Sequence, residues 1–155
     1  MNEAVVETSG QKQNVTIDSP ESLALVLRQL ASGEADLTTR RQAVVSVLRD
    51  VLANGRKEAE QILHDKRNGL DCVIHLSGVM DTIIRALYTV ATQYFYPAVN
   101  PSTSERITII AVGGYGRGTL APGSDIDLLF LLPWKATPWS ESVVETILYA
   151  LWDLK

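Results

Sequence analysis

Two short apolar stretches separated by a glycine-rich segment constrain the fold more than any other feature of this sequence. The first stretch, 106–112, is rich in β-branched residues, and the second, 126–132, is mainly aliphatic and is closed by Pro133. This length and composition are typical of buried strands. The glycine-rich loop between them, 113–124, is too short for the crossover that joins parallel strands. We therefore expect antiparallel neighbours at the start of a mixed sheet.

Helical periodicity dominates the rest of the chain. Apolar residues recur at the spacing of one helix face, and we predict helices over these segments: 23–30, 36–67, 71–96 and 140–154. Thr38 or Thr39 is expected to cap the second helix, and Gly55 to interrupt it. The first 22 residues are polar without a sustained period, so we expect a flexible arm there. The sequence thus predicts an α+β fold, in which N-terminal helices precede strand, glycine-rich loop, strand and helix.

Composition limits the classes of function. The chain has 155 residues, a net charge of −4 and a pI near 5.1, whereas general nucleic-acid binders carry a basic surface. We therefore expect no nucleic-acid partner. Cys72 is the only cysteine, so it has no disulfide partner within the chain, which fits a reducing cytoplasm. Neither a signal-like segment nor a run of about 18 apolar residues is present, so we expect a cytoplasmic protein without a membrane span.

Two aspartates open the second predicted strand. Residues two apart on a strand point to the same side, with Cα atoms about 7 Å apart, so Asp125 and Asp127 are expected to share one face. Adjacent carboxylates repel each other and lose hydration beside an apolar strand. A divalent cation removes that penalty, and Mg²⁺ prefers carboxylate oxygens combined with substrate phosphates. The pair therefore predicts a magnesium site for phosphoryl chemistry.

The glycine-rich segment supplies groups suited to phosphate. Gly113 and Gly114 directly follow the first predicted strand, and without a Cβ their backbone N–H groups can approach phosphate oxygens closely. Arg117 offers a fork-shaped cation, and Ser124 offers a hydroxyl beside the aspartates. A glycine turn or an Asp-x-Asp segment alone is common in proteins that bind no phosphate. Their combination in this order favours a nucleotide site.

The order of paired glycines, a spacer and Asp-x-Asp on a strand resembles the nucleotidyltransferase superfamily that includes DNA polymerase β. More narrowly, the segments VGGYGRG, LAP and SDIDLLFL are similar to the PII-protein uridylyltransferases of bacterial nitrogen regulation: 112–118, 120–122 and 124–131. Tyr115 and Arg117 within the glycine run distinguish this narrower family. The preceding helices and the segment 148–153 are also similar to it, although they are less specific.

The resemblance implies Mg²⁺-dependent transfer of UMP from UTP to a tyrosine hydroxyl of the trimeric signalling protein PII. By this resemblance Asp125 and Asp127 hold the metal and act in catalysis, and the nucleotide contacts the residues Gly113, Gly114, Arg117 and Ser124. Only the N-terminal part of such long enzymes is matched, so we expect a truncated domain. The chain then divides into a flexible arm (1–22), a helical region (23–100) and a partial nucleotidyltransferase core (101–155).

Two alternatives stay open at this point. The first alternative is another nucleotidyltransferase, such as an adenylyl-transferring relative. The second alternative is an inactive module that binds nucleotide or PII. The superfamily's third acidic residue, expected on a later strand, is not identifiable, because Glu141, Glu145 and Asp153 lie on a predicted helix as surface charges. His64 and Asp65 resemble the pair found in metal phosphohydrolases. Such sites need several histidines and the chain has two, so we interpret this pair as helix surface.

Overall fold

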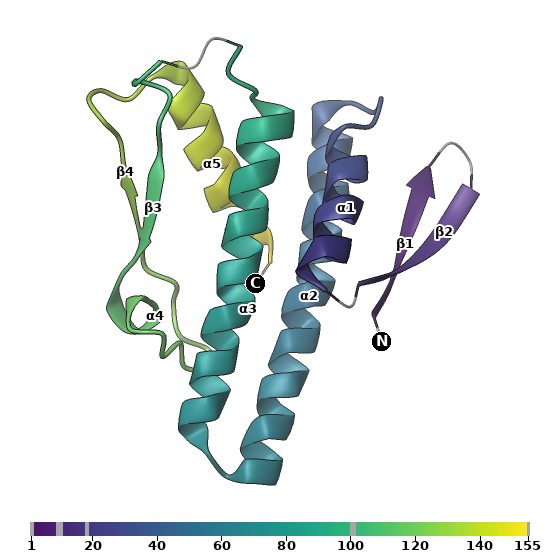
Figure 1. The fold of residues 1–155 in the computed structure, drawn as a ribbon, viewed down its shortest axis with the longest axis vertical. Coiled ribbons are helices and arrows are strands. Elements are labelled where there is room, and N and C mark those ends of the chain that lie inside the picture. The colour runs from purple at the N-terminus through teal and green to yellow at the C-terminus, as the bar shows by residue number, and fades with distance from the viewer. Residues whose placement is uncertain (1, 9–10, 18, 100–101, 155) are drawn as a thin grey trace.

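A long antiparallel helix pair forms the centre of the molecule. The computed structural model describes residues 2–8, 11–17, 19–99 and 102–154. The pair consists of α2 (Leu37–Lys66) and α3 (Gly69–Val90) and runs the length of the molecule (Figure 1). Helix α1 (Pro20–Ala31) packs against both, and α5 (Pro138–Asp153) lies along the other side of α3. Helices therefore precede the strand, glycine segment, strand and helix, and the predicted α+β class is confirmed.

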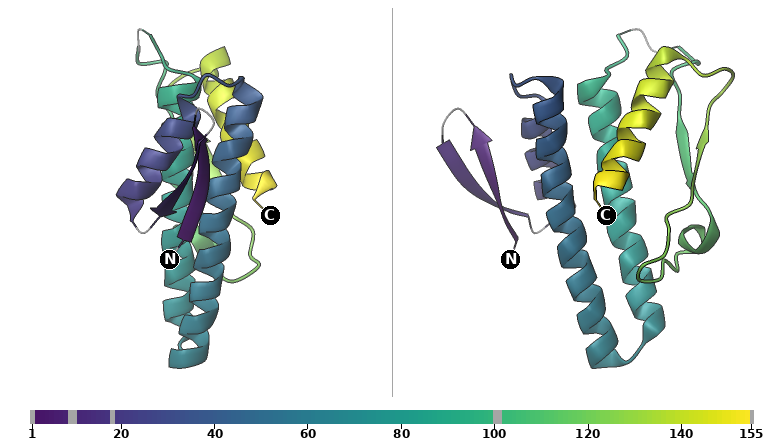
Figure 2. Two further views of the ribbon diagram at one scale, coloured as in Figure 1. Left: turned by 90° about the vertical axis from the view of Figure 1, so that its right-hand side faces the viewer. Right: turned by 180° about the vertical axis from the view of Figure 1, so that it is seen from behind.

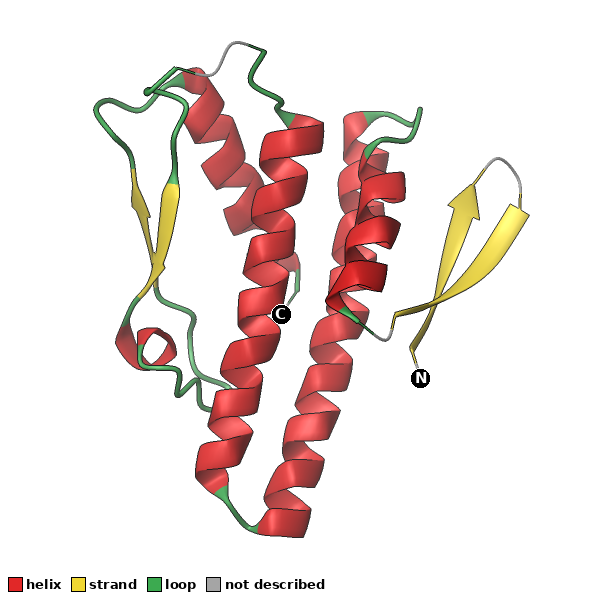
Figure 3. Cartoon of the chain, viewed as in Figure 1, coloured by secondary structure: helices red, strands yellow, loops and turns green. Residues whose placement is uncertain are grey.

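Strands form two separate antiparallel pairs in the described residues, on opposite sides of the helices (Figure 3). Their bounds are β1 (Asn2–Thr8), β2 (Gln11–Ile17), β3 (Thr108–Ala111) and β4 (Leu128–Leu131). The pair β3–β4 lies beside α3 and carries the candidate site. The antiparallel relation predicted for these two strands is confirmed.

The pair β1–β2 occupies much of the segment in which we expected a flexible arm. Its register runs from Asn2 opposite Ile17 to Thr8 opposite Gln11. The segment contains β-branched residues, which favour extended backbone, although they follow no alternating pattern that would have predicted strands. The same segment also contains the first turn of α1, which begins at Pro20 because Ser19 and Ser22 form a reciprocal capping box.

Helix α2 differs from the prediction at two points. Its N-cap is Asp36, whose carboxylate accepts hydrogen bonds from the backbone N–H groups of Thr38 and Thr39 at 2.9 and 3.1 Å. The predicted caps, Thr38 and Thr39, are therefore the donors and lie in the first turn of the helix. Gly55 does not interrupt α2. It lies where α2 crosses α3, and a Cβ at this position would lie 2.6 Å from a methyl carbon of Val79.

The hydrophobic core lies among the four longer helices. The four largest side chains with almost no exposed area come one from each helix, α1, α2, α3 and α5: Leu27, Leu48, Ile83 and Ile147. Cys72 is a buried free thiol within the same core. No helix in the described ranges combines the length and apolar character needed to cross a membrane.

A polar network fixes α5 against the end of α3. Helix α3 continues into one π-helical turn, η1 (Ala91–Phe95), which completes the helix predicted to reach Tyr96. The Arg41 guanidinium donates hydrogen bonds to the Tyr96 hydroxyl and, at 3.0 Å, to Thr146 Oγ1 on α5. The Trp139 indole donates to the Tyr96 carbonyl oxygen at 2.7 Å. These contacts hold α5 alongside α3, as seen from behind in Figure 2.

Two glycines test the packing of α2 on α3. Gly55→Ala forces a methyl group onto Val79, whose side chain is stiff in a helix, so we expect the free energy of unfolding to fall by about 1–3 kcal/mol. Gly78 lies in α3 with nothing within 4 Å of its Cβ position, so Gly78→Ala is the matched control. It is expected to stabilise the chain by about 0.5–1 kcal/mol through helix propensity. Urea unfolding measures both values, and a neutral Gly55→Ala contradicts the tight crossing.

Candidate functional site

The strand pair β3–β4 provides the platform of the site. The register places Thr108 opposite Leu131 and Ala111 opposite Leu128. The Val112 N–H donates to the Asp127 carbonyl oxygen at 3.0 Å, so pairing continues one step beyond the strands. Both strands are shorter than the stretches 106–112 and 126–132 that we predicted.

The two faces of this strand pair differ in burial. Alternate residues are half-buried and pack against the core: Ile109, Ala111, Leu128 and Phe130. The other face leaves large apolar side chains exposed: Ile110, Val112, Leu129 and Leu131. Leu129 therefore lies on the open face, whereas its neighbour Phe130 packs against the core. Asp127 is exposed and lies opposite Val112, so its side chain belongs to the open face as well.

The two predicted metal ligands lie just before β4 rather than within it. Asp125 and Asp127 are both exposed, whereas Ile126 between them is half-buried. This alternation is the pattern of extended backbone and agrees with the spacing argument, which separates the two Cα atoms by about 7 Å. The prediction that the two aspartates open the second strand is wrong in its boundary: β4 begins at Leu128, and Asp127 joins the ladder through its carbonyl oxygen.

Gly113 meets the Asp127 carboxylate. The residue has φ +62°, and a Cβ built on it would lie 2.6 Å from Asp127 Oδ2. A side chain at residue 113 would therefore both strain the backbone and displace the carboxylate. The structure thus brings together the glycine segment and the second aspartate, which the sequence separates by thirteen residues.

The segment predicted as a loop begins with one helical turn, α4 (Gly113–Gly116). The Gly114 carbonyl oxygen accepts the N–H groups of Arg117 and Thr119 at 3.2 and 3.0 Å, which folds the segment back on itself. Gly116 passes so close to the preceding strand that a Cβ would lie 2.5 Å from the Ala111 carbonyl oxygen. Gly116 is therefore required by the turn itself, and this requirement is independent of any ligand.

Helix α3 anchors this segment at two positions that were not predicted from the sequence. The hydroxyl of buried Tyr115 donates to Asp81 Oδ1 at 2.6 Å, and the N–H of buried Leu120 donates to Ser77 Oγ at 3.0 Å. Burial, followed by the hydrogen bond to Asp81, raises the pKa of Tyr115 above its ordinary value, so the phenol stays a donor. The sequence signal for these anchors was the pair Ser77 and Asp81, two polar residues four apart that lie beside the apolar stripe of the helix predicted over 71–96.

Arg117 and Ser124 are both exposed. Ser124 follows a tight turn, in which its N–H donates to the Ala121 carbonyl oxygen at 3.1 Å and Gly123 has φ +76°. Ser124 and Asp125 line a cavity of about 330 Å³ whose opposite walls come from α2, α3 and α5: Arg56, Met80 and Trp152 are among them. These two residues therefore border the helices, whereas Asp127 borders the glycine turn.

The acidic residues fit a magnesium ion only in combination with other ligands. Asp125 and Asp127 provide hard carboxylate oxygens, but the described residues contain no group of three or more His, Cys, Asp or Glu suited to a metal. Glu141, Glu145 and Asp153 lie exposed on α5, as predicted. Mg²⁺ commonly binds through one or two carboxylates with water and phosphate oxygens, so the donor chemistry of the pair is suitable.

Comparisons with known proteins point in the same direction. Residues 100–154 match the nucleotidyltransferase domain family. The chain is 52% identical over 114 residues to a bifunctional uridylyltransferase/uridylyl-removing enzyme of Rhodopseudomonas palustris. The matched region covers 74% of this chain and 12% of that relative. It is 45% identical over 135 residues to a bifunctional uridylyltransferase/uridylyl-removing enzyme of Rhodospirillum rubrum, and this match covers 86% of this chain and 14% of that relative. The chain thus spans about one eighth of the length of these relatives. No solved structure matches it.

The contact between Gly113 and Asp127 is tested by two alanine substitutions. Gly113 and Gly118 both have positive φ, but the Cβ position of Gly118 has nothing within 4 Å. Gly118→Ala is therefore expected to lower the free energy of unfolding by about 1–2 kcal/mol through backbone strain alone. Gly113→Ala should cost more, and Asp127→Ala in the Gly113→Ala background should remove the excess. Equal losses for both single variants, measured by urea unfolding, contradict the contact.

Proposed function

We propose that the chain binds a magnesium nucleoside triphosphate for nucleotidyl transfer. The proposal is supported by the match of residues 100–154 to the nucleotidyltransferase domain family and by the similarity of the chain to bifunctional uridylyltransferase/uridylyl-removing enzymes. The triphosphate would lie between the turn at Gly113 and the aspartates Asp125 and Asp127. The observation that carries this proposal is the contact of the Asp127 carboxylate with Gly113. This contact brings the glycine-rich turn and the Asp-x-Asp segment together in space.

The glycine turn is proposed to hold the phosphates. Gly113 and Gly114 lack side chains, which leaves the backbone open to close approach by phosphate oxygens. Exposed Arg117 supplies a cation whose planar fork matches a phosphate group. Ser124 supplies a hydroxyl next to Asp125. These four residues stay the proposed nucleotide-binding set.

Asp125 and Asp127 are proposed to hold Mg²⁺. Both are exposed, so a hydrated ion can reach them without disturbing the core. When bound, the ion neutralises charge on the phosphate groups during transfer. The two aspartates themselves place negative charge at the edge of an apolar strand face, and this placement favours cation binding.

The substrate is proposed to be UTP, because both relatives are named uridylyltransferases. The acceptor is proposed to be a tyrosine hydroxyl of the PII protein. Its oxygen forms a bond to the α-phosphorus as the bond to pyrophosphate breaks, so UMP is transferred and pyrophosphate leaves. Positioning and charge stabilisation supply such catalysis without a covalent protein intermediate.

The uridylyl-removing activity named for the relatives is not assigned to this chain. The family match falls on the glycine and aspartate segment. His64 and Asp65, which resemble a phosphohydrolase pair, form an exposed contact of 3.1 Å on α2, as expected for helix surface. We therefore propose the transferase half alone.

Paired charge-removing variants test the metal and nucleotide assignment. Asp125→Asn combined with Asp127→Asn is expected to weaken Mg²⁺-dependent UTP binding at least about tenfold, because two charged ligands are lost. The matched control is Glu141→Gln with Glu145→Gln, which removes the same charge from the exposed face of α5. Isothermal titration calorimetry measures the affinity, and circular dichroism checks the fold.

The outcomes separate the proposal from its rivals. Unchanged binding in the aspartate variant, or an equal loss in the control, discards the metal assignment. Tighter binding of ATP than of UTP favours an adenylyl-transferring relative. Binding of UTP without a UMP mass increment on added PII favours an inactive binding module.

A further inference from the structure

Helix α3 contacts both ends of the segment that follows β3. Asp81 accepts the hydroxyl of Tyr115 at 2.6 Å, near the start, and Ser77 accepts the N–H of Leu120 at 3.0 Å, near the end. Ser77 and Asp81 are four residues apart, so they lie one above the other on a single helix face. The segment is therefore held to the rigid central helix by two directional hydrogen bonds.

The turn α4 depends on such external contacts. It contains only four residues, and a single helical turn is unstable by itself because nucleation costs more than it returns. Its closing bonds all join residues close in the sequence: the Gly116 N–H donates to the Val112 carbonyl oxygen at 2.8 Å, the Gly118 N–H donates to the Tyr115 carbonyl oxygen at 2.9 Å, and the Gly114 carbonyl oxygen accepts two further N–H groups. Such local bonds shape the turn but do not orient it relative to α3. The orientation of the turn relative to α3 therefore depends on contacts with that helix, and the nearest of these to the turn is the buried ring of Tyr115 with its hydroxyl.

A short path connects this anchor to the candidate site. Tyr115 is two residues from Gly113, and Gly113 lies against the Asp127 carboxylate. A rotation of α4 that releases the Tyr115 hydroxyl would move Gly113 relative to Asp127. Since both groups are proposed to contact one magnesium nucleotide, such a change alters their spacing directly.

We propose that Asp81 is a positioning residue for the nucleotide site, acting through the Tyr115 hydroxyl to hold Gly113 beside Asp127. Asp81 itself does not touch the proposed substrate. The effect on nucleotide affinity rests on the proposed function, whereas the effect on the turn does not.

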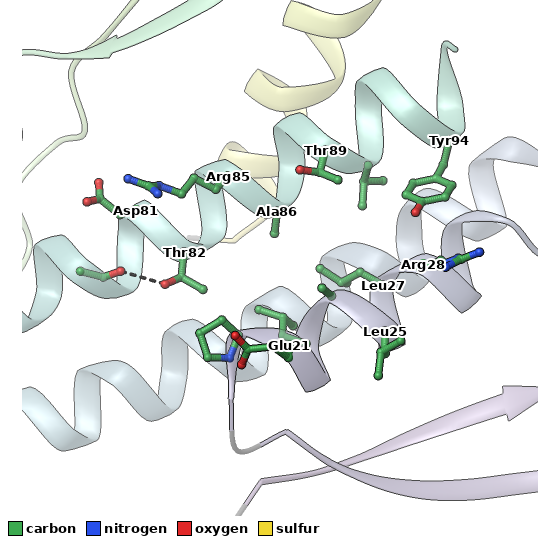
Figure 4. A pocket seen from close by; sticks show the side chains of 15 residues that line it. Glu21, Leu25, Leu27, Arg28, Asp81, Thr82, Arg85, Ala86, Thr89 and Tyr94 are labelled. Atoms are coloured by element: carbon green, nitrogen blue, oxygen red, sulfur yellow. Dashed lines mark hydrogen bonds between the residues drawn. The ribbon is translucent and has the colours of Figure 1, made fainter.

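The surroundings of Asp81 make it suitable for substitution. It is exposed and lies with Arg85 at one end of a cavity of about 790 Å³ between α1 and α3 (Figure 4). It also borders a cavity of about 440 Å³ between α3 and β3, which Tyr115 lines. Because water reaches this carboxylate, replacing it leaves no unpaired charge in the core, and the variants are expected to fold.

Three variants separate the hydrogen bond from the charge. Asp81→Ala and Tyr115→Phe each remove the bond, and each is expected to raise the Kd for magnesium UTP about tenfold. The double variant should be no weaker than either single variant, because both remove one interaction. Asp81→Asn removes the charge but keeps an acceptor oxygen, so its Kd should stay within about threefold of the original. Asp71→Ala is the control and should not change the Kd, because Asp71 is a half-buried aspartate in the first turn of α3 that pairs with Lys66 at 3.6 Å, away from the glycine turn.

Hydrogen exchange of the backbone amides in 113–120, measured without nucleotide, keeps the test independent of the proposed function. Faster exchange is expected in Asp81→Ala and Tyr115→Phe, and unchanged exchange in Asp81→Asn and Asp71→Ala. If the original chain binds no UTP, the proposed function fails and the exchange rates alone decide the role of Asp81. Unchanged exchange in Asp81→Ala, additive losses in the double variant, or an Asp81→Asn variant as weak as Asp81→Ala would each overturn the proposal.

Discussion

The Asp127 carboxylate fills the space where a side chain at residue 113 would stand, and the account of the site depends on this contact. A Cβ at Gly113 would lie 2.6 Å from Asp127 Oδ2. The positive φ of Gly113 directs the chain out of β3 and into α4 at the same place. One glycine thus reverses the chain and admits a carboxylate, which places a proposed phosphate-binding turn next to a proposed metal ligand.

The helices hold the two segments that form this contact in place. Two strands of four residues are a marginal sheet, and the β3–β4 pair gains its support by packing one face on the core. Helix α3 then fixes the turn through Ser77 and Asp81, and α5 is held alongside α3 by Arg41 and Tyr96. The long helix pair therefore acts as the rigid element on which the exposed, charged groups of the site are arranged.

Local patterns predicted much of the fold and the proposed site. The helix pair, the antiparallel strands and the glycine turn follow from periodicity and residue type. Sequence reasoning was wrong where distant contacts decide the outcome. Glycine often interrupts a helix, so Gly55 was predicted to break α2. The helix instead continues through Gly55, because the absence of a side chain there lets Val79 of α3 pack against it. The bond between Asp81 and Tyr115 joins residues 34 positions apart, so the helical period can place Asp81 on a face of α3 but cannot identify Tyr115 as its partner. The metal and nucleotide roles stay predictions.

Paramagnetic broadening tests the central claim most directly. Mn²⁺ replaces Mg²⁺ at many carboxylate and phosphate sites and broadens the NMR signals of nearby nuclei. With UTP present, the account predicts that substoichiometric Mn²⁺ selectively broadens the backbone amide signals of 113–118 and 125–127. The amide signals where α2 ends and α3 begins, near residues 66–69, are expected to stay sharp. Broadening confined to other acidic surfaces, or equal broadening with and without Asp125 and Asp127, would contradict the placement of a metal nucleotide between the glycine turn and the aspartates.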